Sequence, residues 1–198
     1  MGTFGGPDII TDGLVLSLDA ASARSYPGSG STWSDLSGNG HDFTIEATGF
    51  TYNAGGWFDM ADGGMTNGDN STNSTTCTFV FWIRTTDTQS LFWTDDNANS
   101  YLGAYREGNK FYNNEFGSPT LFMNTVSRAN IYDFIRTGEW IMVEFKGANM
   151  SLTNPNKFNT YGSYKFGNGD IAIIQIYNRT LTAAESLQNY NAHKNRFI

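Results

Sequence analysis

The sequence is poor in the residues that build thiol and metal sites. Its 198 residues include one cysteine, Cys77, and two histidines. One cysteine can form neither an intrachain disulfide nor a thiolate metal cage. With only two histidines, a nucleophile–histidine–aspartate triad or a histidine-rich zinc site is hard to build. Cys77 lies beside an apolar run, where a lone cysteine is usually buried, so we expect it in the core.

Positive charge is also scarce. Twelve Lys and Arg stand against 19 Asp and Glu, giving a net charge of −7 and a pI of about 4.6. No basic cluster exists to replace the counterions of a nucleic acid or to bind an anionic membrane surface, so we expect neither partner. No apolar run approaches the roughly 20 residues that span a bilayer. The N-terminus shows no cationic segment followed by an apolar run, so we expect no secretory signal.

Aromatic residues and glycine are plentiful, at 15% of the chain and 22 residues, while proline is limited to four. Many short strands joined by Gly, Asn, Asp and Ser turns give this composition. The strand from Trp140 to Lys146 alternates, with Ile141, Val143 and Phe145 inward and Glu144 and Lys146 outward. We predict strands over residues 14–18, 56–60, 78–84, 91–93, 101–105, 110–112, 120–123, 140–146, 150–152 and 171–177.

The last residues predict a short helix. Thr182-Ala183-Ala184-Glu185 is a capping box. The Thr182 hydroxyl can accept a hydrogen bond from the Glu185 amide, and the Glu185 carboxylate can accept one from the Thr182 amide. Ala183, Leu187, Tyr190 and His193 follow at helical spacing. We therefore expect this stripe to dock outside the sheets, with Leu187 buried and a cost of about 2–4 kcal/mol for Leu187→Ala.

A Gly-rich turn follows residue 32. We expect Asp35 to accept amides of its own turn, Gly38 and Gly40 to supply positive φ angles, and Trp33 to close the edge of the core. Ligand contact by Asp35 is the alternative.

Three stretches resemble the laminin-G-like domains of the concanavalin-A-like superfamily. The closing signature is matched by Asp170-Ile171 and Tyr177-Asn178-Arg179-Thr180-Leu181-Thr182 with Glu185. The Trp-x-Asp-x-Ser-Gly-Asn-Gly stretch starts at Trp33, and Gly138-Glu139-Trp140 matches a further motif. The resemblance implies an all-β, two-sheet antiparallel jelly-roll sandwich with a short C-terminal helix. We assign residues 11–198 to this domain and residues 1–10 to an N-terminal arm.

The resemblance also implies a function. Stretches 12–20, 25–30 and 33–40 look like laminin-G-like structural proteins of tailed bacteriophages. We therefore expect a capsid decoration or fibre/appendage protein on the virion surface, assembled in the host cytoplasm. Its partners would be virion proteins or further copies of itself, together with surface carbohydrate. The alternatives are a stand-alone carbohydrate-binding module and a polysaccharide hydrolase or lyase.

Catalytic carboxylates were sought at alternating positions of one strand, where both would face one cleft. No such pair is present, and Glu139 and Glu144 are an odd number of residues apart. This observation predicts that the chain is not an enzyme and needs no cofactor.

Loop residues beside aromatics give a candidate ligand site. Asp95 and Asp96 can bind through carboxylate oxygens, and Trp93, Tyr101 and Tyr105 can stack on a sugar. Core packing is the alternative for the aromatics. Calcium could be held by Asp95 and Asp96, or by Asp59, Asp62 and Asp69, against the alternative of solvated turn carboxylates.

The N-terminal arm combines flexible and apolar residues. Glycines leave its backbone free, while Phe4, Ile9 and Ile10 offer apolar anchors. We expect residues 1–10 to be disordered alone and to order on the virion. A frayed terminus without a role is the alternative.

Overall fold

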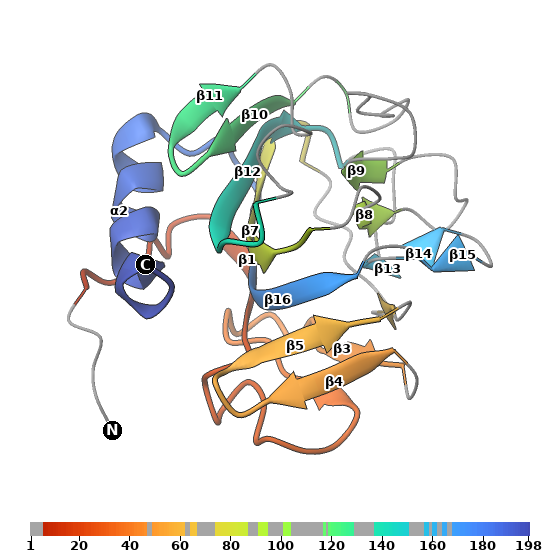
Figure 1. The fold of residues 1–198 in the computed structure, drawn as a ribbon. Helices are drawn as coiled ribbons and strands as arrows, with labels where there is room; N and C mark the ends of the chain where they lie inside the picture. Colours follow the sequence, from red (N-terminus) through yellow and green to blue (C-terminus); the bar gives the residue numbers. More distant parts are fainter. Residues whose placement is uncertain are drawn as a thin grey trace.

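Two antiparallel β-sheets pack face to face, and one helix, α2 (Ala183–His193), covers the outer face of the larger sheet. The computed structural model describes residues 6–46, 49–61, 64–66, 74–86, 91–94, 101–103, 117, 119–128, 137–150, 157–158, 160–161, 164–165 and 168–198. Figure 1 shows α2 on one side of the larger sheet and the smaller sheet on the other. The predicted all-β sandwich with a short C-terminal helix is confirmed.

The larger sheet is built around two long strands that lie side by side, β7 (Cys77–Arg84) and β16 (Gly169–Tyr177). The sheet continues beyond β7 through β12 (Ile141–Ala148), β10 (Thr120–Met123) and β11 (Val126–Arg128). Beyond β16, its first half pairs with β5 (Trp57–Met60), which pairs with β4 (Phe50–Asn53), and its second half pairs with β1 (Leu14–Asp19).

The smaller sheet encloses the main core against the larger one. Its order is β2 (Thr32–Trp33), β3 (Phe43–Ile45), β6 (Met65–Thr66), β13 (Lys157–Phe158), β8 (Leu91–Thr94) and β9 (Tyr101–Gly103), and β14 (Thr160–Tyr161) pairs separately with β15 (Tyr164–Lys165). Inward residues of both sheets form one aromatic-rich cluster, which includes Trp33, Phe43, Phe58, Phe81 and Phe145. Cys77 and Trp33 are fully buried, as predicted.

Most predicted strands that fall on described residues are confirmed, among them the β12 strand with Ile141, Val143 and Phe145 in the main core. The strand predicted over residues 110–112 lies outside the described residues, as do positions 151 and 152. The predicted turn is also confirmed. Asp35 accepts the amides of Ser17 and Ser37 at 2.9 and 2.8 Å, and Gly38 and Gly40 have φ angles of 90° and 78°.

The capping box of α2 forms as predicted. The Thr182 hydroxyl accepts the Glu185 amide, and the Glu185 carboxylate accepts the Thr182 amide. Arg179 donates two hydrogen bonds to the same carboxylate, at 2.7 and 3.0 Å. The Arg179 guanidinium and then the Thr182 amide lower the pKa of Glu185 to about 2. A 3-10 turn, η1 (Lys194–Arg196), follows α2. The described part of the chain contains no apolar helix of membrane-spanning length.

The predicted buried stripe of α2 is wrong for Ala183 and Leu187, whereas Tyr190 is half-buried and packs against Trp82. Leu187 is 48% exposed and Ala183 is exposed, whereas Ser186 and Asn189 are fully buried. Asn189 donates to the Tyr177 hydroxyl at 3.0 Å and accepts the amide of Ile10 at 2.9 Å. These hydrogen bonds to the sheet and to the N-terminal segment hold the helix with a partly polar face inward.

We therefore expect Leu187→Ala to change the free energy of unfolding by less than about 0.5 kcal/mol, as most surface substitutions do. Urea unfolding followed by circular dichroism measures this change. A loss of 2 kcal/mol or more would place Leu187 in the core after all.

The outward side of β12 is covered rather than solvated. Glu144 and Lys146 point away from the main core as predicted, yet they are only 0% and 7% exposed. Ser186 of α2 lies beside Glu144, and the Nζ atom of Lys146 lies 4.4 Å from the centre of the Phe122 ring of β10. A second apolar cluster lies here, including Val80, Trp82, Met142, Ala172 and Tyr177.

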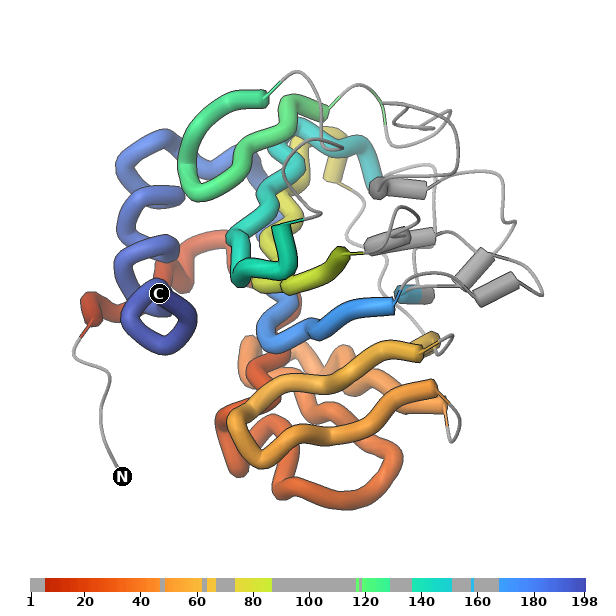
Figure 2. Tube along the Cα trace, viewed as in Figure 1, coloured from red at the N-terminus to blue at the C-terminus, as the bar shows by residue number. Residues whose placement is uncertain are grey.

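The described end of the N-terminal segment lies against α2 (Figure 2). The carbonyl of Asp8 accepts a hydrogen bond from Gln188 at 2.8 Å, and that of Ile10 accepts one from Tyr177 at 3.0 Å. The expectation that residues 1–10 are disordered alone is therefore wrong for residues 8–10, because backbone groups there bind side chains of α2 and β16. Residues 1–5 lie outside the described residues. The domain boundary at residue 11 stays a prediction.

Candidate functional site

Four polar and aromatic side chains form a row across the outer face of the larger sheet. Asp59 of β5 lies opposite Asp170 of β16, and Asp170 lies opposite Arg84 of β7. Trp140 precedes β12 and lies beside Arg84. Partners in an antiparallel sheet point to the same face, so the pairing of the strands places all four side chains together.

Arg84 is held at the centre of this row. Its Nε and Nη2 atoms lie 2.7 and 2.5 Å from the Oδ2 atom of Asp170. Its guanidinium carbon also lies 5.3 Å from the centre of the Trp57 ring and 5.1 Å from that of Trp140. Both distances are within the range of a cation–π interaction. The guanidinium is thus bound by one carboxylate and lies against two neighbouring tryptophan rings.

The aromatic rings continue from this row into the protein. Trp140 lies 4.8 Å from Phe197 and 5.9 Å from Trp57, measured between ring centres. Phe197 stacks on the buried Trp82 at 4.5 Å, and Trp82 stacks on Tyr190 of α2 at 5.7 Å. Trp57, Trp140 and Phe197 are half-buried, so they present aromatic surface on a rigid support.

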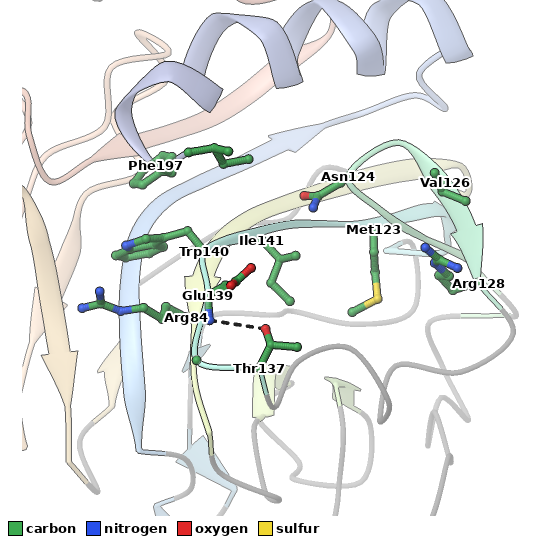
Figure 3. Close-up of a pocket in the computed structure, with 12 residues that line it drawn as sticks. Arg84, Met123, Asn124, Val126, Arg128, Thr137, Glu139, Trp140, Ile141 and Phe197 are labelled. Carbon is green, nitrogen blue, oxygen red and sulfur yellow. Dashed lines mark hydrogen bonds between the residues drawn. The ribbon is translucent and has the colours of Figure 1, made fainter.

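A pocket of about 590 Å³ lies beside Trp140 (Figure 3). Its walls come from the β10–β11 hairpin, from residues 137–141 and from the chain end at Phe197 and Ile198. Asn124 of the hairpin accepts the Met142 amide at 2.9 Å, which ties the hairpin to β12. The next residue, Thr125, has a φ of 70°, an uncommon and strained value for a β-branched residue.

A second pocket of about 280 Å³ adjoins the first, and Arg84 and Gly138 line both. Its lining is polar and includes Asp59, Asp170, Thr85, Thr86 and Asn168. Burial raises the pKa of Asp170, the hydrogen bond and charge of Arg84 oppose this change, and the negative charge of Asp59 adds to it. The two carboxylates are therefore close enough to interact.

The ligand site predicted from the sequence falls largely outside the described residues. Asp95, Asp96 and Tyr105 lie outside the described residues, and only the backbone is described for Trp93 and Tyr101. In that backbone Trp93 lies opposite Leu102, and Tyr101 opposite Thr94. The proposed calcium ligands Asp62 and Asp69 are also outside the described residues. Within the described part, no group of three or more His, Cys, Asp or Glu is placed to hold a metal ion.

The site around Arg84 was missed by the sequence reasoning. The sequence pattern considered was a carboxylate pair within one strand. Asp59 and Asp170 instead face each other from two paired strands and are 111 positions apart in the sequence. Trp57 and Asp59 are two residues apart on one strand, so their side chains share its outer face. This pairing of an aromatic with a carboxylate is the local sequence pattern that points to the site.

No protein-family model and no curated protein matches the chain. Solved structures do match in fold. A Trypanosoma rangeli sialidase mutant with trans-sialidase activity is 12% identical, with a TM-score of 0.56 over 98% of this chain and 35% of that one. The same sialidase in complex with sialic acid is 13% identical, with a TM-score of 0.51 over 92% and 33%. A point mutant of clostridial neurotoxin HCR/D is 12% identical, with a TM-score of 0.60 over 92% and 52%.

These matches correct one prediction. We predicted that the chain is not an enzyme, and the likeness to sialidases contradicts this, because the fold of nearly the whole chain occurs within enzymes. The chain spans about a third of the sialidase chains and about half of the HCR/D chain. At 12–13% identity the matches show the fold alone, an all-β sandwich.

Proposed function

We propose that the protein is a glycan-binding structural protein of a tailed-phage virion, and that the glycan binds at the face around Arg84. The observation that carries the glycan site is the Arg84 guanidinium, which lies against the Trp57 and Trp140 rings. Sugar rings have an apolar face that stacks on tryptophan, and their hydroxyls bind carboxylates and guanidinium groups. Trp140 supplies aromatic surface beside a pocket of suitable size for a small ligand.

The structural neighbours support this choice of ligand class. One of them is a sialidase in complex with sialic acid, an acidic sugar, so the support extends to sugars in general and not to the charge of the ligand. The support for a virion role is the resemblance of stretches 12–20, 25–30 and 33–40 to phage structural proteins.

Binding to an array of immobilised glycans tests the site. Trp140→Ala should weaken binding of each array hit at least about tenfold, because tryptophans at the centre of a binding site often contribute more than about 1.4 kcal/mol. Leu187→Ala is the matched control, since it truncates an exposed apolar side chain on α2 away from the pocket. Equal losses in both variants, or no array hit for the unmodified protein, would refute the site.

The virion role is tested separately. Mass spectrometry of purified phage particles should find the protein at a fixed copy number. Its absence from particles would refute the virion role and leave the glycan site standing as that of a stand-alone binding module.

One observation favours a second candidate, glycan hydrolysis. The facing carboxylates of Asp59 and Asp170 sit in different surroundings, with Asp170 partly buried and its pKa raised. A pair of carboxyl groups in unequal surroundings is the usual machinery of glycoside cleavage. Release of reducing ends from a bound glycan, lost in Asp59→Asn and in Asp170→Asn, would establish this activity.

A further inference from the structure

We propose that the face around Arg84 holds two consecutive units of a neutral oligosaccharide, one in each pocket. This inference rests on the proposed glycan-binding function and extends it to the class of glycan and the number of units bound. The two pockets share Arg84 and Gly138, so one bound oligosaccharide can extend from the first pocket into the second along the surface.

The two pockets offer different chemistry. The larger one presents Trp140, Phe197 and Ile141 together with the polar side chain of Asn124. This lining suits a ring that stacks by its apolar face and hydrogen-bonds at its edge. The smaller one presents Asp59, Thr86 and Asn168, which suit the hydroxyls of the adjoining unit.

Arg84 and Asp170 form a rigid boundary between the pockets. Asp170 has an exposed side-chain fraction of 13%, and its Oδ2 atom contacts two nitrogens of Arg84. The Arg84 guanidinium also lies within cation–π distance of the Trp57 and Trp140 rings. Because these side chains are already in place, a ligand that binds here does not have to order them, and little conformational entropy is lost on binding. This favours measurable affinity for short ligands.

The charges in the pockets favour a neutral ligand. Asp59, Asp170 and Glu139 line them, against two cations, Arg84 and Arg128. Arg84 and Asp170 neutralise each other as an ion pair, which leaves Asp59 and Glu139 against Arg128. The protein as a whole carries a net charge of −7. A sugar with its own carboxylate would therefore meet a repulsive field.

Calorimetric titration of the full chain tests the inference. The probes are glucose, cellobiose and cellotriose, galactose and lactose, with sialyllactose as the acidic counterpart of lactose. Within the neutral series that binds, the disaccharide should bind at least tenfold tighter than the monosaccharide. A third unit should add less than threefold, and lactose should bind tighter than sialyllactose.

Two variants locate the units. Asp59→Ala changes an exposed residue of the smaller pocket, so folding should be preserved. It should reduce disaccharide affinity by at least fivefold and leave monosaccharide affinity within twofold. Trp140→Phe keeps an aromatic ring in the larger pocket and should weaken both ligands equally.

The outcomes distinguish a failure of the two-unit neutral site from a failure of the proposed glycan-binding function. Binding without a gain from one unit to two, or tighter binding of sialyllactose than of lactose, would overturn the two-unit neutral site while glycan binding stands. Absence of binding to these probes and to the glycan array would overturn both.

Discussion

Trp82→Ala is expected to cost about 3–5 kcal/mol of unfolding free energy, the range for removing a buried tryptophan. Trp82 is fully buried on the outer face of β7, outside the main core. It stacks on Phe197 at 4.5 Å and on Tyr190 at 5.7 Å, so it joins the sheet to α2 and to the chain end. Its removal would leave a cavity beneath the helix and loosen the support of the Trp140 pocket.

Urea unfolding monitored by circular dichroism measures this loss. Trp82→Phe is the matched control, because the Trp82 indole nitrogen makes no hydrogen bond within the described residues. We expect the phenylalanine variant to lose less than half as much stability as the alanine variant. A loss below about 1 kcal/mol for Trp82→Ala would mean that α2 does not pack on this tryptophan.

Glu144→Gln is expected to stabilise the protein by about 1–3 kcal/mol at pH 8, because it replaces a buried charge, whose desolvation costs several kcal/mol, by a neutral amide. Glu144 is fully buried under α2, and neither carboxylate oxygen has a hydrogen bond of normal geometry within the described residues. Burial raises the pKa of Glu144, while the Lys146 charge and the nearby Ser186 hydroxyl oppose this change. Glutamine keeps the shape and removes the buried charge.

The pH dependence follows from the direction of the shift. Folding raises the pKa of Glu144. The protein therefore loses stability as the pH rises above the pKa that Glu144 has in the unfolded chain, and the loss continues until the pH passes its higher pKa in the folded protein. His193 acts in the opposite direction at lower pH. Burial lowers its pKa to about 4, outweighing the charge of Asp19, so stability is lost as the pH falls from about 6.5 toward 4.

Unfolding curves at pH 4 and pH 8 therefore separate the two groups. Glu144→Gln should come close to the unmodified protein at about pH 4, where the carboxyl is mostly protonated in both states, and exceed it at pH 8. Glu139→Gln, an exposed counterpart, should show no such difference. A Glu144→Gln variant less stable at pH 8 would reveal a favourable partner for the carboxylate.

Local chemistry was read correctly from the sequence. The capping box between Thr182 and Glu185, the turn around Asp35 and the alternation of β12 each depend on residues a few positions apart. Their hydrogen bonds and side-chain directions follow from backbone geometry, so a single sequence suffices to predict them.

The misread features depend on contacts between distant segments. The helix stripe through Leu187 is the more apolar one, yet Ser186 and Asn189 face the sheet, since Asn189 bonds to Tyr177 and Ile10. Glu144 is buried because that helix, about 40 positions later, covers it. The row from Asp59 to Trp140 needs the order and register of four strands, which no local pattern encodes.

The central claim is that glycan binds at the face around Arg84, and the indole N–H signals of the five tryptophans test it most directly. In a nuclear magnetic resonance titration with the best-binding array glycan, the signals of Trp57 and Trp140 should shift on binding. The signal of Trp33, which is fully buried in the main core, serves as the internal control. Shifts at Trp93, with Trp57 and Trp140 unchanged, would contradict the account and place the glycan at the site predicted from Trp93 and Tyr101.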